Sequence, residues 1–355
     1  MHRYLTLLTQ LAFFTLASLW TASAHAETVK NMENEMQQTA GFALPPPPEK
    51  PEITLLSYTG DMRSYTTKYE DTLLKIARAN NLGYVEIRSA NPGIDPWLPG
   101  ENQNIILPTR HLLPKAARQG VVVNLSEMRL YAFLDHDAPP ITYPIGIGRT
   151  GLKTPIGSTH IIKKKENPVW FPTPRMREED PALPAAVKPG PDNPLGTHAL
   201  YLEWPTFLIH GTSEPWGIGR RVSSGCIRLY PEDIIDFYDQ VDNGTQVTIV
   251  DQPVKTGWID GRLFIEAHVS QSYANDVEES GEQPPLDITE DDLGLILEKA
   301  GNKAHLIDWQ TVREILSQRR GYPIAVTPPA TEMRQAYRKP SHKSSQPDPP
   351  PYALN

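Results

Sequence analysis

Apolar and polar residues alternate in short runs between residues 119 and 251, a pattern that predicts β-strands. Residues 121–124 and 128–133 are expected to form a hairpin around Leu125-Ser126-Glu127. Further strands are predicted over residues 141–147, 159–164, 199–202, 206–209 and 245–250, with a short helix over 231–241. Many short strands and few helices indicate a mainly β domain, built as a sandwich or barrel-like mixed sheet.

Residues 64–108 carry a different pattern, with the order strand, helix, helix, strand. Alternation over residues 65–69 predicts the first strand, and apolar residues at helical spacing from Leu73 to Ala77 predict the first helix. The second helix is expected over residues 85–90, and residues 105–108 close the unit with a strand. We therefore expect a small α+β module in front of the β domain.

The part that follows residue 251 predicts a C-terminal extension over residues 252–327. One strand is expected over residues 258–269, and two helices over 289–300 and 308–320, the first capped by Thr289. Residues 328–355 are rich in Pro, Ser, Lys and Gln and carry few apolar side chains. They are expected to be a disordered tail.

The N-terminal pattern is typical of an export signal. Apolar residues 5–20 follow His2 and Arg3, and Ala24-His25-Ala26 is a small-x-small cleavage pattern. We expect cleavage after residue 26 and a periplasmic mature protein, with an uncleaved anchor as the alternative. Residues 27–63 are expected to form a stiff Pro-rich linker.

Charge and cysteine usage narrow the possible functions. The 355-residue chain has a formal net charge of −8, which argues against a nucleic-acid partner. Cys226 is its one cysteine and cannot form an internal disulfide. In an exported chain this thiol is either an inert buried group or a nucleophile.

The neighbours of Cys226 favour the nucleophile. Gly225 permits a tight turn, and the amides of Gly225 and Cys226 are candidate donors to a developing oxyanion. His210 ends an apolar strand, and the Gly-rich residues after it can return the chain beside that strand. Arg228 falls on the same side of an extended chain as Cys226, where it suits a carboxylate-bearing peptide.

Metal and cofactor chemistry are not expected. His160, His198 and His210 lack a set of partner ligands in the sequence. Taken separately, a lone cysteine is usually a small core residue and a lone histidine at a strand end is usually structural. The two together with a Gly-rich loop favour catalysis over those alternatives.

The run from His210-Gly211-Thr212 to Ser223-Ser224-Gly225-Cys226-Ile227-Arg228 resembles the signature of YkuD-type L,D-transpeptidases of the ErfK/YbiS group. Further matches are Glu127-Met128-Arg129-Leu130-Tyr131, Pro144-Ile145-Gly146-Ile147-Gly148, Lys153-Thr154-Pro155-Ile156-Gly157 and Gly190-Pro191-Asp192-Asn193-Pro194. The chain departs from the family at Ser224, where many members carry histidine.

This resemblance implies an enzyme that acts on peptidoglycan stem peptides without a cofactor. Cys226 would attack the carbonyl of the third stem residue, usually meso-diaminopimelate, and expel the terminal D-Ala. His210 would take the thiol proton and later activate the acceptor amine, while the Gly211 carbonyl holds the imidazole in the useful tautomer. Arg228 would bind a substrate carboxylate. Ser223 and Ser224 would line the site, and residues 170–194 would form a lid.

Three questions stay open at this point. The acceptor amine would belong either to a second stem, giving a 3-3 cross-link, or to a lysine of an outer-membrane lipoprotein. Hydrolysis of the thioester would instead make the enzyme an L,D-carboxypeptidase. A non-catalytic cell-wall binding protein is the third possibility.

Residues 64–108 resemble a LysM module, a small fold that binds N-acetylglucosamine polymers such as peptidoglycan. The resemblance rests on Tyr65-Thr66, Asp71-Thr72-Leu73, Ile76-Ala77, Ala90-Asn91-Pro92 and Pro99-Gly100, and the chain departs from the family at Tyr69-Glu70. It implies a glycan groove with Asp71, Thr72 and Leu73 on one wall and Asn91, Pro92 and Gly93 on the other. A structural spacer is the alternative.

Overall fold

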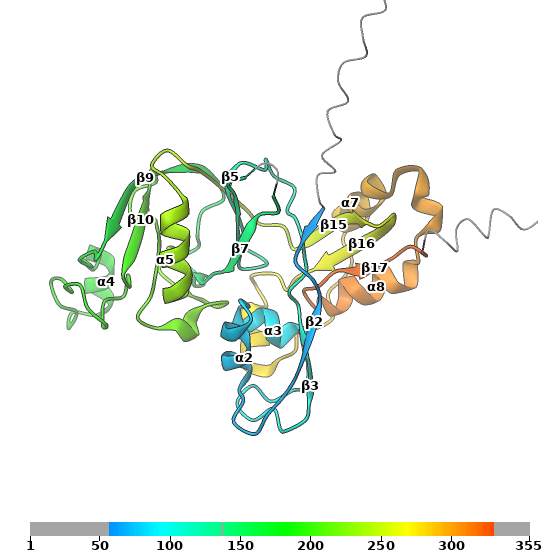
Figure 1. Cartoon of the computed structure of the whole chain (residues 1–355), viewed down its shortest axis with the longest axis horizontal. Coiled ribbons are helices and arrows are strands. Elements are labelled where there is room, and N and C mark those ends of the chain that lie inside the picture. Colours follow the sequence, from blue (N-terminus) through cyan, green and yellow to red (C-terminus); the bar gives the residue numbers. More distant parts are fainter. Residues whose placement is uncertain (1–56, 136–137, 330–355) are drawn as a thin grey trace, which may run out of the picture. The chain divides into compact units, whose positions relative to one another are not determined.

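The computed structural model describes residues 57–135 and 138–329 (Figure 1). The expected signal segment and nearly all of the expected tail lie outside these residues. No helix in the described ranges is long and apolar enough to cross a membrane.

One mixed sheet of eight strands forms the centre of the described unit, in the order β13-β11-β10-β9-β14-β5-β6-β7. Its strands are β5 (Gly120–Asn124), β6 (Arg129–Phe133), β7 (Ile141–Pro144), β9 (Gly157–Glu166), β10 (His198–Leu202), β11 (Leu208–His210), β13 (Ile227–Arg228) and β14 (Gln246–Val250). The β11–β13 and β14–β5 pairs are parallel and the others antiparallel. The expected mixed β-sheet is therefore confirmed.

The predicted hairpin around residues 125–127 is also confirmed, with Val122 opposite Tyr131 in the β5–β6 register. Helix α5 (Pro231–Gln240) follows β13 and packs against β10 (Figure 1). It buries Ile234 and Phe237, the residues whose apolar spacing predicted this helix. Helix α5 also approaches the residue after β11, since a Cβ on Gly211 would come within 2.9 Å of Ile234.

The N-terminal part has the expected order of elements. It consists of β1 (Tyr58–Thr59), β2 (Arg63–Thr66), α2 (Leu73–Ala79), α3 (Tyr84–Ala90), β3 (Asn104–Leu107) and β4 (His111–Leu112). Strands β2 and β3 pair antiparallel around a small apolar core. The linker expected to reach residue 63 ends earlier, because Tyr58 already pairs with Leu112.

The C-terminal extension contains both predicted helices. Its elements are β15 (Val254–Ile259), β16 (Arg262–Ala267), α6 (Ala274–Ser280), α7 (Glu290–Ala300), η2 (Gly301–Leu306), α8 (Trp309–Gln318) and β17 (Ile324–Ala325). Thr289 caps α7 as expected. The single strand predicted over residues 258–269 is wrong, because Asp260 and Gly261 take positive φ values of 48° and 78° and turn the chain into a hairpin.

The long Pro-rich segment before β10 is more ordered than the sequence indicated. It contains helix α4 (Pro174–Glu179), capped by Thr173, and a bridge between Trp170 and Val187. The short strands β8 (Ile147–Gly148) and β12 (Arg221–Ser223) pair with each other outside the main sheet, and the short helix η1 (Pro215–Gly217) precedes β12. Six helical residues between prolines are too few for a recognisable period, so α4 was not predicted.

Candidate active site

The parallel pair β11–β13 brings the predicted site residues together. Ile209 lies opposite Ile227 and His210 opposite Arg228, so Cys226 falls at the entry of β13 beside β11. One cavity of about 600 Å³ is lined by His210, Ser223, Ser224, Cys226 and Arg228 together with the Trp170–Met176 segment. The predicted base, nucleophile and cation therefore face one space.

His210 is buried, and a hydrogen bond from its ring to a backbone carbonyl indicates its tautomer. Nδ1 lies 2.6 Å from the carbonyl oxygen of Gly211, and because a carbonyl only accepts, Nδ1 carries the proton. Burial, and next the charge of Arg228, lower the pKa of His210 to about 3. Nε2 is therefore a neutral lone pair at ordinary pH, which is the form a base needs.

Cys226 is held as a thiol. Its Sγ donates to the carbonyl oxygen of Thr206 at 3.5 Å, and burial raises the pKa of the thiol above its ordinary value. A neutral thiol thus lies in the same cavity as a neutral imidazole. In such a pair, proton transfer to the imidazole would accompany attack by the sulfur, whereas it precedes the attack in sites with a preformed thiolate.

The turn before Cys226 is tied down by Ser223. The buried Ser223 hydroxyl accepts from the Gly225 amide at 3.1 Å and donates to the Cys226 carbonyl. The Gly225 amide is therefore engaged and is not the free oxyanion donor that we expected. The Cys226 amide stays as the candidate oxyanion donor. The Ser223 hydroxyl stabilises the turn through these two hydrogen bonds to the backbone.

Thr154 supports the same turn and was not singled out from the sequence. Its hydroxyl donates to the Gly225 carbonyl at 2.9 Å and accepts from the Gly148 amide at 3.1 Å. The only signal was its place within Lys153-Thr154-Pro155-Ile156-Gly157, a stretch that gives no role to any one residue. Thr154 thus joins the β8 region to the cysteine turn.

Arg228 and Ser224 face the cavity with unused hydrogen-bonding capacity. The Arg228 Nε is buried and has no hydrogen-bond partner among the described residues. Burial lowers the pKa of Arg228, so its charge is poorly solvated. A carboxylate entering the cavity would provide the missing partner. Ser224 is half-buried on the wall.

The loop between His210 and Cys226 also touches the N-terminal part. The amides of Tyr84 and Val85 donate to the carbonyls of Ile218 and Gly219 at 3.2 and 3.1 Å. A Cβ on Gly83 would come within 2.8 Å of the Gly219 Cα, so only glycine allows this approach. Helix α3 thus contacts the catalytic loop, which no local sequence pattern indicated.

The expected glycan wall residues are mostly committed to the fold. Leu73 is fully buried, and the Asn91 side chain bonds Ile87 and Ile106, so neither can line an open groove. Asp71 accepts from Tyr65 and Thr72 caps α2. Pro92 is exposed. The expectation for Leu73 and Asn91 was wrong. Leu73 belongs to the apolar core, and the Asn91 amide holds the chain after α3 against β3.

A buried cluster in the described region has a geometry that could hold a cation. Ligand atoms of His111, Glu127 and Glu266 lie within 4.8 Å of one another. The ammonium of Lys255, however, lies 2.8 Å from both carboxylates. A protein cation already neutralises the pair, so we assign no metal to it.

The comparisons with known proteins find one family model and several relatives of this chain. Residues 118–249 match the L,D-transpeptidase catalytic domain, YkuD. The chain is 36% identical over 295 residues to the probable L,D-transpeptidase ErfK/SrfK of Escherichia coli, covering 81% of this chain and 92% of the relative. It is 41% identical over 214 residues to the probable L,D-transpeptidase YbiS of E. coli, 59% of this chain and 70% of that protein. The catalytic domain of an E. faecium L,D-transpeptidase is 20% identical with a TM-score of 0.31, covering 39% of this chain and 100% of that domain.

Proposed function

The chain belongs to the L,D-transpeptidase family, and from that membership we propose that it is a periplasmic cysteine acyltransferase acting on peptidoglycan stem peptides. The observation that carries the proposal is the shared cavity of His210, Cys226 and Arg228 across the β11–β13 pair. A nucleophile, a base with a fixed tautomer and an unpaired cation are the groups that acyl transfer from a carboxylate-bearing peptide requires.

The first half of the reaction forms a thioester. Cys226 Sγ turns from the Thr206 carbonyl and attacks the carbonyl of the third stem residue, while His210 Nε2 takes its proton. The Cys226 amide stabilises the oxyanion. The C–N bond to D-Ala then breaks, His210 returns the proton to the leaving amine, and D-Ala departs.

The second half transfers the acyl group. An acceptor amine loses a proton to His210 Nε2 and attacks the thioester, and the thiolate of Cys226 leaves and regains that proton. We propose that the amine belongs to a second stem or to a lysine of an outer-membrane lipoprotein. Water in its place would give the L,D-carboxypeptidase reaction.

The N-terminal part is proposed to be a LysM-like module that binds the glycan. The confirmed order of β2, α2, α3 and β3 supports this. Of the expected groove residues, Asp71, Thr72 and Pro92 keep some exposure and are the ones to test.

Intact-mass analysis of the mature protein with a carbapenem tests the catalytic proposal. We expect one covalent adduct on the wild type and none on Cys226→Ala. The Ser272→Ala variant is the matched control, because it truncates an exposed side chain that does not line the cleft. A folded wild-type protein that forms no adduct would favour a non-catalytic wall-binding protein.

A further inference from the structure

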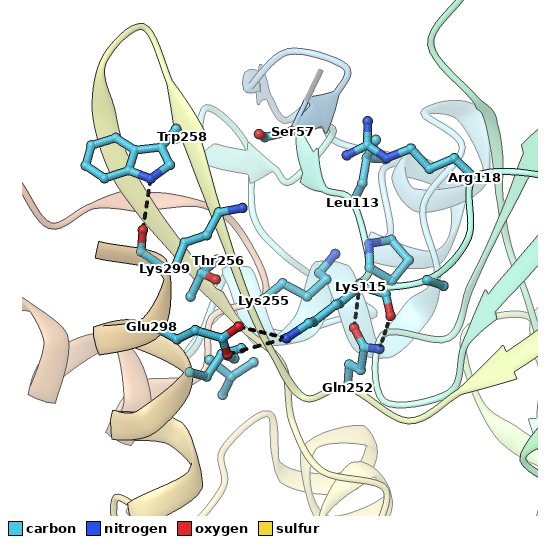
Figure 2. A pocket seen from close by; sticks show the side chains of 14 residues that line it. Ser57, Leu113, Lys115, Arg118, Gln252, Lys255, Thr256, Trp258, Glu298 and Lys299 are labelled. Atoms are coloured by element: carbon cyan, nitrogen blue, oxygen red, sulfur yellow. Dashed lines mark hydrogen bonds and ion pairs between the residues drawn. The ribbon is translucent and has the colours of Figure 1, made fainter. Parts of the chain in front are cut away.

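A second cavity, of about 490 Å³, lies in the described region between the segment leading into β5 and the C-terminal extension (Figure 2). Figure 2 shows residues Leu113, Lys115 and Arg118 on one side and Trp258 and Lys299 on the other. As lined by the described residues, it has no residue in common with the catalytic cavity. It is therefore a separate place where a ligand can bind.

The lining of this cavity is cationic although the chain is acidic. Four basic residues, Lys115, Arg118, Lys255 and Lys299, face one acid, Glu298, whereas the whole chain carries a net charge of −8. Lys255 is neutralised by its two buried carboxylates, and Lys115 pairs with Glu298 at 3.3 Å. Arg118 and Lys299 remain as the free charges of the cavity.

Of these two cations, Arg118 is the one best placed to bind an anion. It is half-buried, and burial alone lowers its pKa. Within the described residues its guanidinium has no hydrogen bond and no ion pair, and neither has the Lys299 ammonium. A partly desolvated guanidinium without a partner is unfavourable until an anion supplies one, and its planar fork fits a carboxylate.

Part of the remaining wall is apolar, beside the polar side chains of Ser57, Gln252 and Thr256. Leu113, Val254 and Leu295 line it, and the Trp258 indole is fixed because its Nε1 donates to the Lys299 carbonyl at 3.1 Å. A small inorganic anion would leave these surfaces uncovered. A ligand with carboxylates on short aliphatic stems would satisfy both kinds of wall, and the volume suits a short peptide.

We propose that this cavity is an exosite for an acidic peptide. Its identification as a peptidoglycan stem, whose residues carry several free carboxylates, rests on the proposed function. Arg118 binds one carboxylate through its fork, Lys299 binds a second, and Trp258 packs against the aliphatic part. The exosite would hold a neighbouring stem of the polymer while the cleft acts on another.

Indole N–H signals in NMR spectra test the exosite and the cleft separately. Trp258 reports on the exosite and Trp170 on the cleft, each assigned through its substitution by phenylalanine. The probes are the tripeptide L-Ala-γ-D-Glu-meso-diaminopimelate and the same peptide with its carboxylates amidated. We expect the first to shift the Trp258 signal saturably and the second to bind about tenfold more weakly or worse.

Arg118→Gln should weaken the Trp258 response by about tenfold, and Lys299→Gln should weaken it in the same direction. The Trp170 response and carbapenem acylation should stay unchanged in both variants. Lys165→Gln is the matched control, because it removes an exposed positive charge on β9 away from this cavity.

Three results would overturn the exosite. These are a Trp258 signal that does not move, a response unchanged in both variants, and inorganic phosphate acting as well as the tripeptide, which would assign the cavity to phosphate. Absent acylation with an intact Trp258 response would instead refute the proposed function and leave an acidic-peptide site standing.

Discussion

The proposed catalytic residues His210 and Cys226 owe their protonation states to burial rather than to a partner of opposite charge. Burial disfavours the imidazolium of His210 and the thiolate of Cys226 alike, so both groups rest in their neutral forms. The Nδ1 bond to Gly211 then decides which nitrogen can act as the base. This arrangement would keep the thiol weakly reactive until a substrate reaches His210.

The low pKa of His210 predicts a flat acid limb of the rate profile. A histidine with an ordinary pKa would lose about nine-tenths of its basic form between pH 7.5 and pH 5.5. With a pKa of about 3, His210 stays neutral over that range. We expect the second-order rate of carbapenem acylation to change by less than about twofold there. A fall of about tenfold with a midpoint near pH 6.5 would contradict the assignment.

The same shift makes the fold less stable in acid. Between about pH 6.5 and pH 3 the unfolded chain binds a proton that folded His210 does not. The free energy of unfolding therefore decreases as the pH is lowered, by about 1.4 kcal/mol per pH unit for this one group. Circular dichroism at each pH therefore has to accompany the rate measurement. His210→Gln is the control, because it should remove both the activity and this part of the pH dependence.

We expect the substitution of Gly225 by alanine, which adds one methyl group, to lower the acylation rate strongly. Its φ is 109°, and an added Cβ would come within 2.8 Å of the Phe207 ring. Gly225→Ala should therefore displace the Cys226 turn and reduce the acylation rate by about a hundredfold, the scale of losing a positioned group at an acyl-transfer site. The matched control is Gly244→Ala, with a φ of 89° and open space around the site. Equal losses in both variants would show that backbone strain, and not position, is responsible.

At the scale of elements, the sequence pattern predicted those helices and strands whose formation depends on residues close together in the chain. Alternation located the β5–β6 hairpin, and Thr289 located the start of α7. The sequence also placed His210, Cys226 and Arg228 in one site, because a strand end, a Gly-rich return and an extended chain follow from short segments. The β15–β16 hairpin was missed although Asp260-Gly261 is a strong turn signal.

Contacts between distant elements could not be predicted in this way. Nothing in the periodicity of α3 says that Gly83 meets Gly219, since the two positions come together only when the whole unit folds. The same reason explains the error at Leu73 and Asn91, whose burial is decided by what packs on them. Sequence reasoning therefore placed the proposed reacting groups in one cavity but missed the residues that support them.

The α3 contact predicts that the N-terminal part affects the chemistry. Gly83→Ala would push its Cβ to 2.8 Å from the Gly219 Cα, where backbone has to move. We expect acylation by a small carbapenem, which needs no glycan binding, to slow by about tenfold while the protein stays folded. Gly294→Ala in α7 is the control, since it has open space and should stabilise the helix by about 0.5–1 kcal/mol with an unchanged rate. An unchanged rate in Gly83→Ala would mean that α3 only tethers the loop.

At the scale of the described unit, buried charges join three parts of the chain. Glu86 of α3 binds Arg129 of the sheet at 2.7 Å, and His111 of β4 lies 3.4 Å from Glu127. Lys255 of β15 lies 2.8 Å from both Glu127 and Glu266, and His268 is 2.7 Å from Glu266. These charged groups lie close to one another only when all three parts are in place, so the described unit should unfold as one.

Lys255→Met tests that cooperativity. It leaves Glu127 and Glu266 buried without their shared cation, and losing one partner of a buried pair costs about 3–5 kcal/mol. Chemical denaturation followed by both tryptophan fluorescence and circular dichroism should show a lower midpoint, with the two signals still coincident.

Lys303→Met, at an exposed lysine over the Trp258 ring, should leave the midpoint nearly unchanged. Adding Glu266→Gln to Lys255→Met should recover part of the loss, because one uncompensated charge is removed. Two separate transitions in Lys255→Met, with the sheet keeping the wild-type midpoint, would instead mean that the C-terminal extension unfolds independently and that this cluster does not couple the parts.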